Sequence, residues 1–106
     1  MGKMLTSNVD MSIHNKIKEA PTQSGCYIFM DELGHVIYVG KAKNIRNRVK
    51  SYFTLSAAEN WRRSELVQRI ADVEYRVTES ELDALLLEYR LIKQFKPWHN
   101  SPTSGR

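Results

Sequence analysis

The chain has 106 residues, of which 42% are hydrophobic and 26% charged, so it can bury one core and form one domain. No stretch approaches the ~20 consecutive apolar residues of a membrane-spanning helix, and the N-terminus lacks the apolar run of a secretory signal. A single cysteine and three scattered histidines exclude a disulfide framework and a structural zinc site. We therefore expect a cytoplasmic protein with no membrane contact.

The net charge is +4, and its position is more informative than its size. Ten residues in the middle of the chain contain five basic side chains and no acidic one: Lys41, Lys43, Arg46, Arg48 and Lys50. The other 96 residues carry 11 basic and 12 acidic side chains. A basic segment interleaved with apolar residues indicates either a phosphate-binding face or a solvated helix face whose long side chains lie along the surface.

Residues 1–11 are polar and without periodicity, which predicts a disordered leader. Apolar residues at helical spacing after Ser12 predict a short helix that ends by Pro21. We expect one folded domain over residues 12–100 and a loose tail over residues 101–106.

Two segments rich in β-branched and aromatic residues, 26–30 and 35–39, flank the loop 31–34 and predict a β-hairpin. Gly40 is expected to end the second strand, so that the basic segment follows it.

The register of this hairpin decides which side chains meet. Without a bulge, Met30 pairs with His35, and Tyr27 then lies directly opposite Tyr38 with Cβ atoms ~5 Å apart. A bulge at Gly34 would break this register. The two tyrosines are either a structural cross-strand pair or two phenols placed together for chemistry.

A helix is predicted over residues 44–53, where four apolar residues recur at helical spacing. Arg48 lies four residues before Tyr52, so both side chains share one flank of the apolar stripe.

Ser56 and Glu59 have capping-box spacing and open a further helix, whose apolar face includes Trp61 and Leu66. Alternation of apolar and polar residues over 73–77 then predicts a third, one-sided strand.

Thr78 and Glu81 have the same capping-box spacing and predict the start of the longest helix, residues 79–95, which Lys96 and Pro97 end. The order of elements predicts an α+β fold, a small and mainly antiparallel three-stranded sheet flanked by helices. No heptad repeat or large apolar patch is evident, so we expect a monomer.

Glu88 is the least expected residue of this last helix, because its four helical neighbours are all apolar: Ala84, Leu85, Leu91 and Ile92. Its carboxylate is predicted to point toward the core or its rim. A buried carboxylate shifts its pKa, finds a basic partner or binds a metal, so a salt bridge to an arginine and a metal site are both open.

These residues suggest hydrolytic chemistry on a phosphate. A single carboxylate suits Mg²⁺, which keeps most of its waters, and a helical arginine can hold the phosphate that the metal polarises. No histidine is placed near them as a base. A phenol, with a pKa near 10, is a poor base unless a cation favours phenolate, and Lys41 follows closely on Tyr38.

The motifs together resemble the GIY-YIG endonuclease superfamily, over roughly residues 17–100. The resemblance is carried, in order, by Gly25-Cys26-Tyr27, Tyr38-Val39-Gly40, Lys41-Ala42-Lys43-Asn44-Ile45-Arg46-Asn47-Arg48, Ser51-Tyr52-Phe53, Ala84-Leu85-Leu86-Leu87-Glu88 and Pro97-Trp98-His99-Asn100. The first motif has Cys26 in place of isoleucine, and we interpret this cysteine as a small core residue.

The resemblance implies hydrolysis of a DNA phosphodiester with one divalent ion, Mg²⁺ or Mn²⁺. It makes Glu88 the metal ligand and Arg48 the group that binds and neutralises the scissile phosphate. Tyr27 and Tyr38 would flank the attacking water, with either one as the base. Four further residues match positions that tune the site or contact phosphate: Lys41, Lys43, Tyr52 and Asn100.

Within the superfamily the similarity is greatest to nuclease domains of the UvrC type. That implies the 3′-side incision of nucleotide excision repair, with a UvrB-type helicase partner bound through regions absent from these 106 residues. The length leaves two alternatives, an excised catalytic domain and a free-standing nuclease of homing or mobile-element type. A non-catalytic nucleic-acid-binding module would need a broken site, and no candidate position is broken.

Overall fold

The computed structural model describes residues 13–54 and 61–100, without the side chains of residues 61–64. The predicted leader and tail, the capping box at Ser56 and Glu59, and the Trp61 side chain lie outside the described residues.

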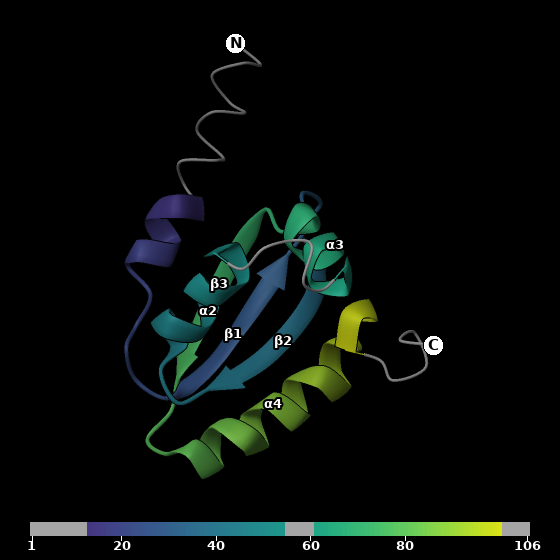
Figure 1. Ribbon diagram of the computed structural model, residues 1–106. Coiled ribbons are helices and arrows are strands. Elements are labelled where there is room, and N and C mark those ends of the chain that lie inside the picture. The colour runs from purple at the N-terminus through teal and green to yellow at the C-terminus, as the bar shows by residue number, and fades with distance from the viewer. Residues whose placement is uncertain (1–12, 55–60, 101–106) are drawn as a thin grey trace.

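The centre of the fold is a three-stranded sheet in the order β2-β1-β3, with both pairs antiparallel. Its strands are β1 (Gly25–Met30), β2 (Val36–Ala42) and β3 (Asp72–Val77). Five of the six β1 residues are buried, because this strand has a neighbour on each side and helices on both faces. The predicted α+β fold with a small antiparallel sheet is confirmed (Figure 1).

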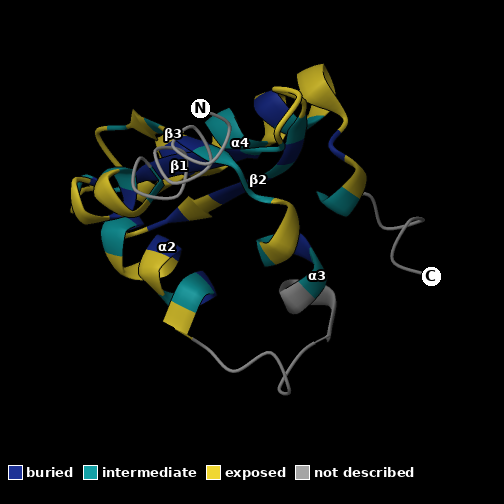
Figure 2. Cartoon of the chain, turned by 90° about the horizontal axis from the view of Figure 1, so that it is seen from above, coloured by how far each residue is buried: buried dark blue, intermediate teal, exposed yellow. Residues whose placement is uncertain are grey.

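The helices divide between the two faces of the sheet (Figure 1). Helical residues 13–18, α2 (Ile45–Thr54) and α3 (Trp61–Arg69) contribute to a core cluster with Tyr27 and Phe29 of β1. On the opposite face, α4 (Glu81–Phe95) packs on the alternate side chains of β1, and the short 3-10 helix η2 (Trp98–Asn100) follows it. Figure 2 shows the buried residues gathered in the sheet and on the helix faces that meet it.

The predicted hairpin register is wrong by two residues. Tyr38 pairs with Phe29, Tyr27 pairs with Gly40, and the register shifts between Phe29 and Met30, where β2 carries an extra residue. A β-bulge of this kind cannot be recognised from the loop sequence. Because a shift of two residues leaves every side chain on its original face, Tyr27 and Tyr38 still share one face, as diagonal neighbours.

The second strand does not end at Gly40 as predicted, but continues through Lys41 to Ala42. Gly40 is needed for space rather than for a turn, since a Cβ at this position would lie 2.3 Å from both Cζ and Oη of Tyr27. The Tyr27 ring therefore lies across the backbone of β2. Lys41 is part of the strand and, opposite Cys26, projects toward the α4 face.

The predicted capping box at Thr78 is also wrong. The N-cap of α4 is Ser80, whose hydroxyl accepts from the backbone N–H of Asp83 at 3.1 Å, and the helix begins at Glu81. The Thr78 hydroxyl instead donates to the Ser80 carbonyl. The predicted end of the helix is confirmed, because Lys96 adopts the left-handed conformation that terminates it.

The sequence predicts no large apolar patch, but the outer face of α4 carries several exposed apolar side chains. Four side chains at helical spacing are between 45% and 64% exposed: Leu82, Leu85, Leu86 and Tyr89. The apolar residues of α4 run around most of its circumference, whereas only one side meets the sheet, at Ala84 and Leu91.

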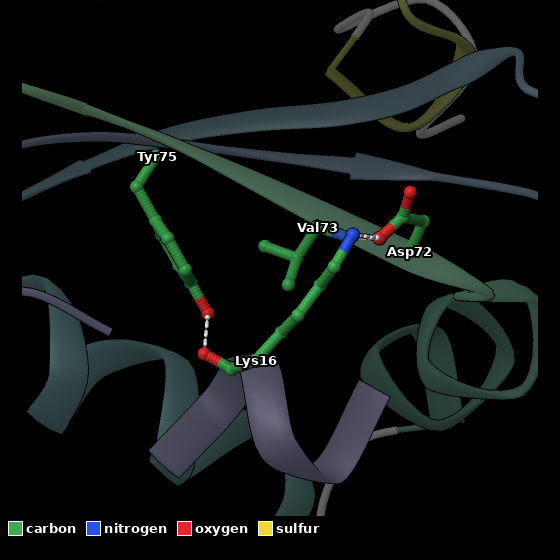
Figure 3. Close-up of polar contacts among 4 residues, drawn as sticks. All are labelled: Lys16, Asp72, Val73 and Tyr75. Carbon is green, nitrogen blue, oxygen red and sulfur yellow. Dashed lines mark hydrogen bonds and ion pairs between the residues drawn. The ribbon is translucent and has the colours of Figure 1, made fainter. Parts of the chain in front are cut away.

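The N-terminal helical segment is fixed to the third strand by two polar contacts (Figure 3). The Lys16 ammonium forms an ion pair with the Asp72 carboxylate, and the Tyr75 hydroxyl donates to the Lys16 carbonyl at 2.8 Å. Both contacts join residues more than fifty positions apart in the sequence. No helix within the described ranges is long and apolar enough to cross a membrane.

The contact between Gly40 and Tyr27 predicts that Gly40→Ala destabilises the fold by about 1–3 kcal/mol, because the added methyl must displace a ring in a close-packed core. Urea unfolding measures this loss. Gly34→Ala is the comparison, since Gly34 has positive φ but no atom within 4 Å of an added Cβ. We expect near-UV circular dichroism of the tyrosines to change only in Gly40→Ala, and an unchanged spectrum would contradict the close contact.

Candidate active site

Three tyrosines from β1, β2 and α2 meet beside the edge strand. The hydroxyls of Tyr27 and Tyr52 lie 3.0 Å apart, within hydrogen-bond distance, and the two ring centroids are 5.7 Å apart. Tyr38 completes the group, with its ring centroid 6.1 Å from each of the other two. The sequence prediction that Tyr27 and Tyr38 lie together is confirmed, although they are not a cross-strand pair.

Burial raises the pKa of both motif tyrosines well above the usual value of a phenol, so both are protonated at neutral pH. For Tyr27, the neighbouring Tyr38 adds to this increase, whereas Tyr52 and the Arg48 guanidinium oppose it. For Tyr38, Tyr52 and the Glu88 carboxylate raise the pKa further. The cation that favours phenolate is therefore Arg48 beside Tyr27, not Lys41 beside Tyr38.

Arg48 projects from α2, where Ile45 and Val49 are buried against the sheet and Tyr52 enters the tyrosine cluster. This packing confirms the predicted amphipathic helix. Arg48 itself is exposed, and its proximity to Tyr27 places a permanent cation next to the phenols.

A basic pocket of about 220 Å³ lies at the end of β2 and is lined by residues from α2 and α4 as well. Lys41, Lys43 and Arg48 line it, together with Ala42 from β2 and Glu81 and Ala84 from α4. The Lys43 ammonium lies 4.0 Å from the Glu81 carboxylate. The predicted phosphate-contacting residues Lys41, Lys43 and Arg48 are thus brought together, around a space that suits an anion.

Glu88 is half-buried on α4, one helical turn beyond Ala84 of this pocket. Its charge raises the pKa of Tyr38 on the strand and of the Cys26 thiol, which places the carboxylate close to both. Among the described residues, no hydrogen bond or ion pair to Glu88 is present, so the alternative of a salt bridge to an arginine finds no support there.

The donor set available to a metal is small. Within residues 13–54 and 61–100, no group of three or more His, Cys, Asp or Glu side chains could hold a metal ion. A half-buried carboxylate with no described ion partner still fits Mg²⁺, which is commonly bound through one or two carboxylates and keeps several waters.

Asn100 does not face the pocket but holds the edge strand. Its side-chain oxygen accepts from the Val39 N–H at 2.7 Å, and its side-chain nitrogen donates to the Val39 carbonyl at 2.8 Å. The amide thus takes the place of a neighbouring strand on β2, between Tyr38 and Gly40. Its role in the structure is to position this strand.

Three residues that line the pocket were missed by sequence reasoning: Ala42, Glu81 and Ala84. For Glu81 and Ala84, their positions seven and four residues before Glu88 on the same helix were the available signal. Cys26 was interpreted as a core residue, and the structure agrees, since its thiol is fully buried and lies 3.3 Å from the Ala84 carbonyl.

Comparison with known proteins gives a consistent result. Residues 23–101 match the model of the UvrC-like GIY-YIG domain. The chain is 47% identical over 90 residues to UvrABC system protein C of Mesoplasma florum and 49% identical over 88 residues to that of Lactobacillus delbrueckii subsp. bulgaricus. These matches cover 85% and 83% of this chain but only 15% and 14% of the relatives, so the chain spans about one-seventh of their length.

The fold is similar to a solved structure as well. The GIY-YIG N-terminal endonuclease domain of UvrC from Thermotoga maritima, bound to its catalytic divalent cation, magnesium, superposes with a TM-score of 0.75 and 34% sequence identity. The match covers 85% of this chain and 97% of that domain.

The two hydrogen bonds of Asn100 predict that Asn100→Ala costs about 1–3 kcal/mol, because the N–H and C=O of Val39 lose their partners. Hydrogen exchange at the Val39 amide should accelerate, while Asn100→Asp, which keeps the acceptor, should give a smaller effect. Asn47→Ala, an exposed asparagine on α2, is the control. Equal exchange rates in Asn100→Ala and the control would contradict the role assigned to Asn100.

Cys26 predicts a pH dependence of stability. Burial, reinforced by Glu88, raises the pKa of the thiol from 9.0 to about 11. Because the folded-state pKa is the higher one, the stability contributed by the protonated thiol is present below pH 9 and is lost as the pH rises toward 11. The free energy of unfolding should fall more steeply in this range for the wild type than for Cys26→Ala, which lacks the thiol. If the free energy of unfolding depends on pH in the same way in both proteins, the prediction is wrong.

Proposed function

The chain belongs to the family of UvrC-like GIY-YIG domains, and from this membership we propose that it makes the 3′-side incision of nucleotide excision repair. The domain is a divalent-metal-dependent endonuclease that hydrolyses a DNA phosphodiester bond. The observation that carries the assignment in this chain is the Glu88 carboxylate, which has no ion partner among the described residues and lies beside a pocket lined by three basic side chains.

We assign binding of the scissile phosphate to Arg48. Its guanidinium lines the basic pocket and lies close to Tyr27, so a phosphate held there would be near the tyrosine cluster. Arginine binds phosphate oxygens in pairs and stabilises the negative charge that grows in the transition state. Lys41 and Lys43 add positive charge to the same pocket and would contact the flanking phosphates.

Glu88 would hold the divalent ion, Mg²⁺ or Mn²⁺, with water as the remaining ligands. When bound, the ion supplies positive charge that polarises the phosphodiester and stabilises the leaving oxygen. Glu88 lies one helical turn beyond Ala84 of the pocket on α4, whereas Arg48 lies on α2.

Tyr27 and Tyr38 would bind and orient the attacking water. Both phenols are protonated at neutral pH, and each can donate to or accept from a water molecule. Tyr52 holds the Tyr27 hydroxyl through the 3.0 Å contact, and Asn100 fixes the strand that carries Tyr38. These two residues position the phenols.

The whole protein is expected to need more than this domain. Relatives about seven times longer are UvrABC system proteins, so we propose DNA as the substrate, a UvrB-type helicase as the partner through regions outside this chain, and the cytoplasm as the location. The identity of 47–49% with these relatives favours repair over a free-standing homing-type nuclease. A non-catalytic binding module is disfavoured, because every candidate catalytic side chain is present.

The assignment of Glu88 predicts that Glu88→Gln removes Mn²⁺- or Mg²⁺-dependent nicking of supercoiled plasmid by more than 100-fold while the melting temperature stays near that of the wild type. The amide keeps the shape of the side chain but loses the charge that a hard cation needs. Nicking is measured as relaxed plasmid against time, with and without metal.

Glu81→Gln is the matched control, because Glu81 is a second carboxylate on the same helix and pairs with Lys43 at the exposed rim. It should retain nicking within a few-fold of the wild type. Full activity in Glu88→Gln, or equal loss in both variants, would show that Glu88 is not the metal ligand.

A further inference from the structure

Arg46 belongs to the basic segment in sequence but is used differently from its neighbours. It is half-buried, and its Nε donates to the Ala20 carbonyl at 2.8 Å. Lys43, Arg48 and Lys50, in contrast, are exposed. The guanidinium of Arg46 is therefore bonded to the backbone that precedes β1.

The first turn of α2 is held by the same stretch of chain. The backbone N–H groups of Ile45 and Arg46 donate to the carbonyls of Gln23 and Pro21, at 3.1 and 2.9 Å. The Asn47 N–H donates to the Asn44 side-chain oxygen at 3.0 Å. Because these N-terminal amides already have acceptors, the helix end is not open to a phosphate, and recognition of phosphate by α2 falls to the Arg48 side chain.

The carbonyl that Arg46 binds is itself anchored. Ala20 is fully buried and follows the helical residues 13–18, to which its N–H is bonded through the Ile17 carbonyl. Lys16 of the same segment is fixed to Asp72 and Tyr75 of β3 (Figure 3). A continuous set of contacts therefore runs from β3, at the edge of the sheet opposite β2, to the start of α2.

We propose that Arg46 is a positioning residue that sets the rotation and axial position of α2, and through them the location of the Arg48 guanidinium beside Tyr27 in the basic pocket. This inference rests on the proposed role of Arg48 in phosphate binding. Arg48 lies two residues, about 3 Å of helix rise, beyond Arg46, so a slide or rotation of the first turn carries it directly. A displacement of about 1 Å at a catalytic group can cost 100-fold in rate.

The test compares Arg46→Met with Lys50→Met in the 106-residue chain. Both variants lose one positive charge from α2 and keep an unbranched side chain, but only Arg46 donates to the Ala20 carbonyl. Plasmid nicking in Mn²⁺ gives kcat and KM, and fluorescence anisotropy gives DNA affinity at several salt concentrations. Arg48→Ala serves as the reference for complete loss of the phosphate contact.

We expect Arg46→Met to lower kcat roughly 10- to 100-fold, with KM and DNA affinity changed no more than in Lys50→Met. Lys50→Met should weaken DNA binding slightly and leave kcat unchanged, as for a charge that meets only the backbone of the DNA. Arg46→Lys, which retains a donor for the Ala20 carbonyl, should recover part of kcat and provides the test if Arg46→Met does not fold.

A second readout is independent of cleavage. The Nε–H resonance of Arg48 should shift or broaden in Arg46→Met and Arg46→Lys, in that order of size, and not in Lys50→Met. If the wild type fails to nick DNA, the proposed function falls, and this resonance still decides whether Arg46 positions Arg48. An unmoved resonance, an unchanged kcat in folded Arg46→Met, or a loss confined to DNA affinity would overturn the proposal.

Discussion

The close approach of the Tyr27 ring to the backbone of β2 at Gly40 is the contact on which the site depends. Any side chain at position 40 would occupy the space of the phenol, since even a Cβ would lie 2.3 Å from the ring. With the ring in this place, its hydroxyl meets Tyr52 from α2, and Arg48 is the nearby cation that partly opposes the effect of burial on its pKa. The two tripeptide motifs are therefore coupled: the tyrosine of one requires the glycine of the other.

The same contact lies on an edge strand, and this location explains how side chains from both faces of the sheet reach one place. β2 has β1 on one side only, so α2 and α4 approach its free edge from opposite faces. An unpaired edge is also exposed to pairing with another chain. Asn100 bonds both backbone groups of Val39 and covers this edge in the middle of the strand, which keeps Tyr38 and Gly40 in register with β1.

The sequence predicted the faces and elements better than the contacts between them. Alternation along a strand decides the face of each tyrosine, so Tyr27 and Tyr38 were placed together correctly even though the bulge moved the register by two residues. Helix starts were less predictable, because both Thr78 and Ser80 are residues that can form an N-cap. Only the Ser80 hydroxyl accepts from a free backbone N–H of the first turn, whereas the Thr78 hydroxyl donates to a carbonyl. The contact of Asn100 with Val39 joins residues 61 positions apart, and no local pattern contains it.

Only some of the basic side chains in the segment 41–50 are available to bind DNA, which limits the affinity of this domain for DNA on its own. Of the five cations of this segment, Arg46 is bonded to the Ala20 carbonyl and Lys50 does not line the basic pocket, which leaves Lys41, Lys43 and Arg48 to contact phosphate there. Each phosphate neutralised contributes about −0.9 to the slope of log affinity against log salt, so three such contacts would bind DNA weakly and with a strong dependence on salt. The positive charge of this domain is concentrated at the bond to be cut. In relatives about seven times longer, the additional regions are large enough to bind DNA as well.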